Sequence, residues 1–314
     1  PGIWWLYYVL TSFWCTRDLN WKEVTLIHGH FSIPAGFTAA LLSRWYRKPF
    51  VLTEHYGRFA TLVKPLIRGA VAKWSFKQAQ RTIVVSRTLR DTIEQTGVQA
   101  HFEIVPNIVD TALFQPAPAS ERQAGTFELL WVGSLVPIHY RNKGIVELLQ
   151  AMAIAVQELK LDVHLNLIGG GAALTECINL ARELNIQEQC NFLGGLSHVE
   201  VRDWMQKCDA LVVASYIESF SVVLVEALAC GKPVLATRCG GPEEILAPET
   251  GILVPARDPK ALAEGMQRLI ETYHTFDSQK IVPYVERFSP ARVADQLTNI
   301  YHDVLSEKRE NVDG

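Results

Sequence analysis

Short apolar runs alternate with helical patterns from Val24 almost to the C-terminus, and this alternation restricts the possible folds more than any other feature of the sequence. Runs such as 210–213 and 251–254 are too short for buried helices, and each is followed by a segment with helical periodicity. Parallel strands read as nearly continuous apolar runs because helices cover both faces of their sheet. The pattern therefore predicts an α/β protein in which helices cross over between parallel strands.

The same patterns give approximate bounds for the elements. Strands are predicted at residues 25–28, 50–53, 82–85, 102–105, 128–132, 163–168, 190–193, 210–213, 233–236 and 251–254. Helices are predicted at residues 35–45, over much of 60–80, and at 87–96, 145–158, 175–184, 199–207, 261–273 and 290–305.

A chain of 314 residues is long enough for two domains with separate cores. Between residues 106 and 125 the periodicity is broken by prolines, a serine and a glycine, which is typical of a linker. We therefore predict a first domain at 1–106, a linker at 107–125, a second domain at 126–288 and a C-terminal helix at 289–314.

Composition excludes several classes of protein. The formal net charge of -3 gives no indication of nucleic-acid binding. The six cysteines are scattered without a C-x2-C pair, which indicates reduced thiols in a cytoplasmic protein and neither a disulfide framework nor a zinc site. The apolar segment 2–15 is too short for a membrane span and lacks the features of a signal peptide, so we predict a buried helix of the first domain there.

The run from Glu218 to Gly231 carries the most chemical information. It places Glu218 before a predicted helix and Glu226 inside that helix, eight residues later. Free N–H groups and the dipole at a helix N-terminus favour a phosphate. A carboxylate further along the helix cannot favour phosphate, so Glu226 is suited to accept hydrogen bonds from sugar hydroxyls.

This run resembles the E-x7-E signature of retaining glycosyltransferases of family 4, and the resemblance extends over about residues 28–305. It implies the GT-B fold, in which two doubly wound Rossmann-like domains border a cleft. The first domain would lie on the acceptor side, the second would bind the nucleotide sugar, and the last helix would cross back to the first domain. That family's first domain opens with a strand, a glycine-rich turn and a helix, none of which is found here, so we expect the chain to lack the start of this domain.

The resemblance also implies roles for individual residues of the second domain. Glu218 would lie by the donor sugar, Glu226 would bind the ribose, and the helix start would face the diphosphate. That helix start comprises Ser219, Phe220 and Ser221.

A second family pattern, V-G-R-L followed by K-G, is matched by Gly133, Ser134 and Lys143. It implies that Lys143 contacts the diphosphate, for which a mobile ammonium group is suited. Ser134 replaces the family's arginine, and Arg141 is a candidate to replace that missing cation.

Three further positions are implied by the resemblance. His55, which ends the 50–53 strand region in a Thr-x-His pattern, would lie near the transferring sugar. Gly169 follows another strand and would border the donor, and Leu193 falls in the segment whose main chain contacts the base. We therefore predict the catalytic residues His55, Lys143 and Glu218. The predicted donor-binding residues are Gly133, Ser134, Arg141, Lys143, Gly169, Leu193, Ser219, Phe220, Ser221 and Glu226.

Residues 58–90 contain basic side chains but no acidic side chain before Asp91. Such a segment is typical of a solvated surface, and it is also able to hold a protein on anionic lipid at the inner face of a cell membrane. The first of these interpretations is the simpler one.

The function that these motifs indicate is retaining transfer of a sugar from a nucleotide sugar to an acceptor hydroxyl on a glycan, a lipid-linked molecule or a small molecule. The resemblance implies a cytoplasmic role in cell-envelope polysaccharide synthesis, without a metal or another cofactor. A nucleotide-sugar epimerase and a non-catalytic nucleotide-sugar-binding protein remain alternatives. A glycosidase is disfavoured because Glu218 and Glu226 belong to one loop-helix unit, and a nicotinamide dehydrogenase because the G-x-G-x-x-G pattern is absent.

Overall fold

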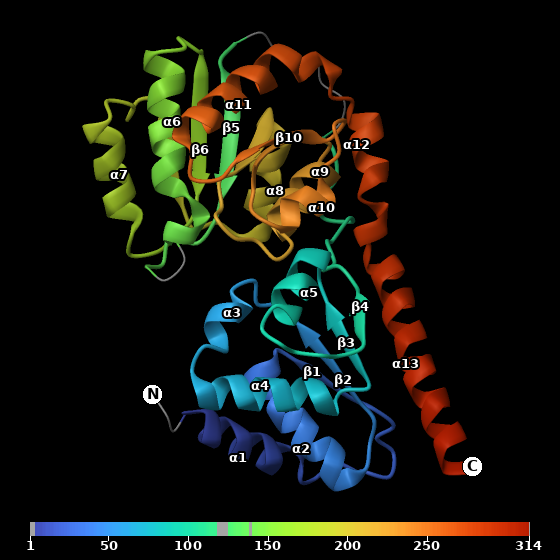
Figure 1. Cartoon of the computed structure of the whole chain (residues 1–314). Helices are drawn as coiled ribbons and strands as arrows, with labels where there is room; N and C mark the ends of the chain where they lie inside the picture. The colour runs from blue at the N-terminus through green and yellow to red at the C-terminus, as the bar shows by residue number, and fades with distance from the viewer. Residues whose placement is uncertain (1–3, 118–124, 138–139, 314) are drawn as a thin grey trace. The chain divides into compact units, whose positions relative to one another are not determined.

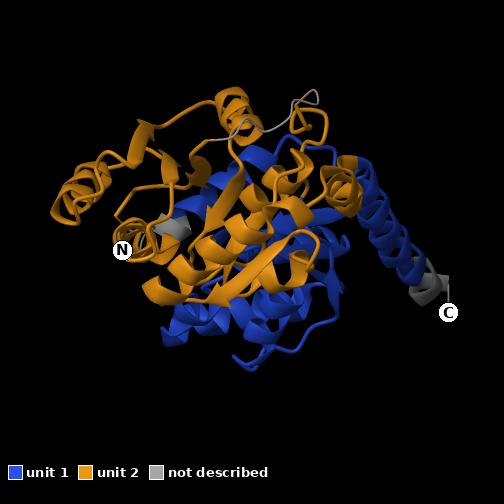
Figure 2. Cartoon of the chain, turned by 90° about the horizontal axis from the view of Figure 1, so that it is seen from above, with its two compact units in different colours: residues 1–107, 291–314 blue, residues 108–290 orange. Residues whose placement is uncertain are grey.

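The computed structural model describes residues 4–117, 125–137 and 140–313. The chain forms two compact units (Figures 1 and 2). Unit 1 comprises residues 1–107 together with 291–314, and unit 2 comprises residues 108–290.

Unit 1 is built on a four-stranded parallel sheet in the order β1-β2-β3-β4 (Figure 1). Its strands are β1 (Ile27–His30), β2 (Phe50–Glu54), β3 (Arg81–Val84) and β4 (Phe102–Ile104). Its helices are α1 (Trp4–Thr16), α2 (Phe37–Tyr46), α3 (Phe59–Leu62), α4 (Leu66–Gln78) and α5 (Arg87–Glu94), and a short turn, η1 (Ser32–Gly36), precedes α2. The helix predicted over much of 60–80 is divided into α3 and α4, because Pro65 caps the start of α4.

The last helix, α13 (Pro290–Asp313), lies almost entirely in unit 1. Its Val293, Ile300 and Val304 pack against Val51 and Ile83 of the sheet. Burial of these apolar side chains attaches a segment from the end of the chain to a sheet formed by its beginning.

The prediction of a buried helix near the N-terminus is wrong with respect to burial. Helix α1 forms there, and Val9 is buried, but Tyr7, Leu10 and Trp14 are 62%, 60% and 65% exposed. The reason is that apolar residues surround this helix instead of forming one stripe, so a single packed face leaves the others in solvent. Among the described residues, no helix is both long enough and apolar enough to span a membrane.

Unit 2 contains a six-stranded parallel sheet in the order β10-β9-β8-β5-β6-β7 (Figure 1). Its strands are β5 (Phe127–Val132), β6 (Val163–Ile168), β7 (Cys190–Gly194), β8 (Ala210–Val213), β9 (Val234–Arg238) and β10 (Gly251–Pro255). The strand order reverses between β5 and β8, which makes this sheet doubly wound. Ligands of such sheets bind beyond the carboxyl ends of the strands at this reversal.

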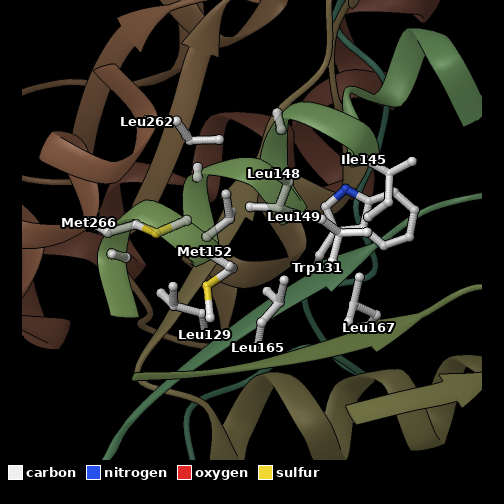
Figure 3. Close-up of a cluster of buried hydrophobic side chains, with 14 of the residues drawn as sticks. Leu129, Trp131, Ile145, Leu148, Leu149, Met152, Leu165, Leu167, Leu262 and Met266 are labelled. Atoms are coloured by element: carbon white, nitrogen blue, oxygen red, sulfur yellow. The ribbon is translucent and has the colours of Figure 1, made fainter. Parts of the chain in front are cut away.

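Helices of unit 2 connect and cover these strands. They are α6 (Ile145–Gln157), α7 (Leu174–Glu183), α8 (His198–Lys207), α9 (Val222–Ala229), α10 (Gly241–Ile245), α11 (Pro259–Thr272) and α12 (Ser278–Tyr284). Figure 3 shows the core on one face of the sheet, where Leu148 and Met152 of α6 and Met266 of α11 pack against Leu129 and Leu165. These side chains are completely buried, so they fix the strands whose carboxyl ends carry the candidate site.

The predicted linker at 107–125 is wrong for its first part, because residues 108–117 belong to unit 2. Val109 and Phe114 are buried, and the N–H of Val109 donates to the carbonyl of Phe288 at 3.1 Å. Prolines interrupted the periodicity of this segment, but two apolar side chains were enough to anchor it. Residues 118–124 of the predicted linker lie outside the described residues.

Candidate active site

Two predicted catalytic residues meet where the strand order of unit 2 reverses. Lys143 follows β5 and Glu218 follows β8, and the Nζ of Lys143 lies 2.6 Å from the Oε1 of Glu218. The hydroxyl of Ser215 donates to the same carboxylate oxygen at 2.7 Å. Glu218 is thus held by one cation and one hydroxyl, with only 13% of its side chain exposed.

A glycine places Lys143 at this point. Gly144 has a φ of 63°, and a Cβ there would come within 1.9 Å of the carbonyl oxygen of Ala214. The next contact between the two loops is a hydrogen bond at 2.8 Å from the N–H of Tyr216 to the carbonyl of Asn142. Only glycine allows this close approach of the loop after β5 to the end of β8.

The main chain of Glu218 is held by the loop that follows β9. Its N–H donates to the carbonyl of Cys239 at 2.9 Å, and its carbonyl accepts from the N–H of Gly241 at 2.8 Å. A Cβ at Gly241 would lie 2.5 Å from the carbonyl oxygen of Phe220. Glu243 stabilises this loop in turn, because its carboxylate accepts from the N–H groups of Cys239 and Gly240.

The start of α9 adjoins Glu218 and contains a strained residue. Phe220 is buried and packs edge-on against Phe288, with ring centroids 5.4 Å apart. Ser221 has a φ of 75° and a ψ of 77°, and its buried hydroxyl has no hydrogen-bond partner among the described residues. A buried hydroxyl without a partner is unfavourable, so it is a candidate to bind a ligand.

Glu226 lies on α9 and is partly buried. Burial raises the pKa of this carboxyl group above its usual value, and the nearby His198 opposes the shift. The side chain therefore takes up a proton more readily than an exposed glutamate does.

The glycine turns after β5 and β6 pack closely together. A Cβ at Gly169 would lie 2.1 Å from the carbonyl oxygen of Gly133, so a side chain at this position would collide with the neighbouring turn. Ser134 is exposed, and Arg141 lies against Tyr140, to whose hydroxyl its Nε donates at 3.2 Å. Leu193 is part of β7 and is half-buried.

The sequence did not single out Ser215, although it stands three residues before Glu218. Its hydroxyl contact depends on the turn between β8 and α9, and no spacing rule identifies it. The neighbouring Tyr216 was also missed; Arg257 lies over its ring at 4.6 Å from the centroid. Burial, followed by a hydrogen bond to Glu147, raises the pKa of Tyr216 to about 12.

His55 of unit 1 belongs to a cluster of three histidines at the carboxyl ends of β1 and β2. The Nε2 of His55 lies 3.0 Å from the Nδ1 of His30, and the ring of His30 stacks on that of His28. His28 is held between the hydroxyls of Thr53 and Tyr301, each 2.7 Å away. Burial, together with the neighbouring imidazoles, lowers the pKa of His28 to about 4 and lowers the pKa of His55.

A groove of about 610 Å³ lies elsewhere in unit 2, along the amino-terminal parts of β5, β6 and β7. It is lined by Glu128, Asn166 and Trp204 among other residues, and by no predicted site residue. Among the described residues, no group of three or more His, Cys, Asp and Glu side chains is arranged to hold a metal ion.

Two family models match the chain. The model for glycosyl transferases group 1 matches residues 119–275. The model for glycosyltransferase family 4 matches residues 3–113. The two matches correspond closely to unit 2 and to the N-terminal part of unit 1.

Individual relatives agree with these matches. An uncharacterized glycosyltransferase of Methanocaldococcus jannaschii is 31% identical over 267 residues, which cover 84% of this chain and 70% of that protein. The solved structure of sucrose-phosphate synthase from Thermosynechococcus elongatus has a TM-score of 0.81 at 25% identity, covering 96% of this chain and 78% of that one. HepE of Anabaena, solved in complex with UDP, also has a TM-score of 0.81, at 22% identity, covering 96% and 84% of the two chains. These likenesses confirm the predicted GT-B fold with two Rossmann-like domains.

Proposed function

We propose that this chain, which belongs to the group 1 family of glycosyltransferases, moves a sugar from a nucleoside diphosphate to an acceptor hydroxyl with retention of anomeric configuration. The acceptor hydroxyl would belong to a glycan, a lipid-linked molecule or a small molecule. A role in cell-envelope polysaccharide synthesis is the setting that we propose.

The contact between Lys143 and Glu218 is the observation that carries this proposal. In a nucleotide sugar, an anionic diphosphate is joined directly to a ring of hydroxyl groups. A cation and a carboxylate 2.6 Å apart match that junction, because the ammonium group suits the phosphate and the carboxylate suits the hydroxyls. The donor would replace the ion pair by two separate sets of contacts.

Other residues of unit 2 complete the proposed donor site. The N-terminus of α9, with Ser219, Phe220 and Ser221, would bind the diphosphate through main-chain N–H groups and the Ser221 hydroxyl. Glu226 would accept hydrogen bonds from the ribose, and the main chain at Leu193 would contact the base.

The remaining predicted residues have more limited proposed roles. Gly133 and Gly169 would allow the donor to approach the main chain, and Ser134 would lie beside it. Arg141 would serve as a second cation only after leaving Tyr140. His55 would hydrogen-bond the transferring sugar.

We propose that leaving-group stabilisation and positioning supply most of the catalysis. Lys143 and the α9 N-terminus would neutralise the charge that develops on the departing diphosphate, without a bound metal or another cofactor. The acceptor hydroxyl would attack from the face that the diphosphate leaves, which accounts for retention without a covalent intermediate.

A panel of UDP-, GDP- and ADP-sugars tests this function. UDP comes first because HepE, which shares the fold, was solved with UDP and with UDP-glucose. We expect one donor to raise the melting temperature and to yield a product heavier than the acceptor by one glycosyl residue, with the donor's anomeric configuration in the NMR spectrum. Glu218→Gln should bind this donor but lose most of its turnover.

Three results would contradict the proposed function. An inverted product would contradict retention. Release of free nucleotide and an epimerised sugar without acceptor would indicate the epimerase alternative. Donor binding without turnover against glycan, lipid-linked and small-molecule acceptors would indicate a non-catalytic binding protein.

We also propose peripheral contact with anionic lipid at the inner face of the cell membrane through the basic segment 58–90. Leu66 and Ile67, at the start of α4, are 92% and 74% exposed, and the exposed Lys64 and Arg68 flank them. Apolar side chains beside cations suit a lipid interface. Cosedimentation with phosphatidylglycerol vesicles, but not with phosphatidylcholine vesicles, should be lost in Leu66→Ser/Ile67→Ser; equal binding of both vesicles would contradict the proposal.

A further inference from the structure

Glu54, the last residue of β2, is a completely buried carboxylate that accepts three main-chain hydrogen bonds. Its Oε2 accepts from the N–H of Ser32 at 2.9 Å. Its Oε1 accepts from the N–H of His55 at 2.9 Å and from the N–H of Tyr56 at 3.0 Å. The side chain therefore joins the segment after β1 to the segment after β2.

Both segments carry a histidine of the cluster. His30 stands two residues before Ser32, and His55 itself donates to Glu54. The two imidazoles lie nearly parallel, at 13°, with ring centroids 5.3 Å apart and nitrogens 3.0 Å apart. Any change in the distance between the two segments would change this contact.

The chain between His30 and Ser32 leaves little freedom for adjustment. Phe31 has a φ of 65°, its N–H donates to the carbonyl of Thr53 at 2.7 Å, and its carbonyl accepts from Gly36. A Cβ at Gly36 would meet both that carbonyl oxygen and Leu52 at 2.7 Å. The turn is thus fixed against β2 at its main chain, and Glu54 is the side chain that continues this attachment to Ser32.

Folding of β2 does not by itself require a charge at this position. The four other residues of the strand are buried, and none of them is charged. Among the described residues, no basic group lies within ion-pair distance of Glu54. A buried carboxylate without a cation is costly, and three charge-assisted hydrogen bonds are what offset this cost here.

We propose that Glu54 is a positioning residue for sugar transfer, which sets the distance and orientation of the His30–His55 pair by holding the main chain after β1 and β2. This inference rests on the proposed function, in which His55 contacts the transferring sugar. Glu54 itself does not contact the substrate. The carboxylate of Glu54 fixes the main chain of His55, and the ring of His30 fixes the Nε2 of His55.

The test compares Glu54→Gln with Gln80→Ala. The glutamine variant places an amide N–H₂ against at least one main-chain N–H group, so one attachment is lost while the side chain keeps its size. Gln80 is the matched control, because its Oε1 accepts from the N–H of Phe50 at 2.6 Å, at the other end of the same strand. Gln80→Ala should weaken β2 without moving the histidines.

Two measurements separate positioning from stability. Nitrogen NMR signals of the His30 and His55 rings should shift in Glu54→Gln and stay unchanged in Gln80→Ala. The kcat should fall roughly 10- to 100-fold in Glu54→Gln, as expected for a small displacement of a reacting group, while the Kd for UDP stays within about twofold. If Glu54→Gln does not fold, Glu54→Asp, which withdraws the carboxylate by one methylene, should give a smaller shift of the same signals.

The proposal is overturned if the folded Glu54 variant keeps both ring signals and kcat at wild-type values, or if Gln80→Ala produces the same shifts. A wild-type chain without turnover on any donor would contradict the proposed function. The ring signals would still decide whether Glu54 positions the histidines, so the two failures are distinguishable.

Discussion

The chemistry of individual residues centres on Lys143, whose ammonium group now contacts a carboxylate that the donor would also need. Substituting Lys143 by Ala should raise the donor KM or lower kcat by roughly 10- to 100-fold, because a hydrogen bond to a charged group contributes about 1.5–3 kcal/mol. Steady-state kinetics with the best donor of the panel measures the effect. Lys160→Ala, an exposed lysine beyond the far end of α6, is the control.

Arg141 decides how that result is interpreted. If Lys143→Ala keeps wild-type kinetics while Arg141→Ala lowers them, the diphosphate contact belongs to Arg141. If neither variant changes the kinetics, the diphosphate does not bind at the loop after β5.

Glu226 should make nucleotide binding depend on pH. Its pKa is raised above 4.5 by burial, so the carboxylate becomes protonated at a higher pH than an exposed glutamate does. A protonated acid accepts hydrogen bonds from ribose hydroxyls less well, and the Kd for UDP should therefore weaken as pH falls through the raised pKa. The terminal phosphate of UDP also titrates in this range, with a second pKa of about 6, so calorimetric titration between pH 4.5 and 8 should show a steeper loss of affinity at low pH in the wild type than in Glu226→Gln.

The raised pKa of Glu226 gives folding stability the opposite pH dependence to that of UDP binding. Because the folded-state pKa lies above the unfolded one, the native state holds this proton more tightly, and stability is lost as pH rises from the unfolded pKa through the raised value. Glu226→Gln should therefore be no less stable than the wild type at pH 8. A parallel pH dependence of UDP binding in both proteins would exclude Glu226 from the ribose contact.

At the scale of single elements, Ser221, which precedes α9, combines a strained main chain with a hydroxyl that has no hydrogen-bond partner among the described residues. Ser221→Gly should remove the strain of the left-handed conformation, which costs a non-glycine residue roughly 1–2 kcal/mol, and it also removes the buried hydroxyl. The greater backbone entropy of glycine in the unfolded chain offsets about 0.5–1 kcal/mol of this gain in stability. We expect the melting temperature of unit 2 to rise by a few degrees while the affinity for UDP falls. Differential scanning fluorimetry with and without UDP measures both effects; a stabilised variant with full UDP affinity would remove the hydroxyl from the donor site.

The sequence predicted elements best where their local pattern was unambiguous. The bounds predicted for 163–168 and 210–213 agree with β6 and β8, because turn residues and helical patterns limit these strands on both sides. Helix α12 was missed, because Pro283 lies inside it and its seven residues are too few for a clear period. Its position depends on packing against α9, which is a tertiary effect.

The candidate site was predictable only as a set of residues. The sequence identified Lys143 and Glu218 by a family resemblance, but their contact follows from the order of β5 and β8 in the sheet. Glu54 was passed over because the Thr-Glu-His pattern directs attention to His55. Its role follows from the main-chain geometry of Phe31–Ser32, which no periodicity encodes.

At the scale of the whole molecule, two units with separate cores should unfold in two steps. UDP at 100 times its Kd adds about 2.7 kcal/mol to the free energy of unfolding of the unit that binds it. Because the proposed donor site lies in unit 2, we expect scanning calorimetry to show two unfolding transitions. UDP should raise the midpoint temperature of only one of them. Glu226→Ala should abolish most of that increase, and an equal increase of both transitions would contradict a donor site built from unit 2 alone.

Attachment of α13 to the first sheet has a consequence for biosynthesis. Val293, Ile300 and Val304 are translated after residues 108–290, whereas the strands that they cover are translated before that segment. We therefore expect the sheet of unit 1 to keep part of its apolar surface uncovered until α13 has been translated, which is after residues 108–290. Multidomain chains usually fold from the N-terminus onward, and we expect unit 2 of this chain to complete its folding before unit 1 does.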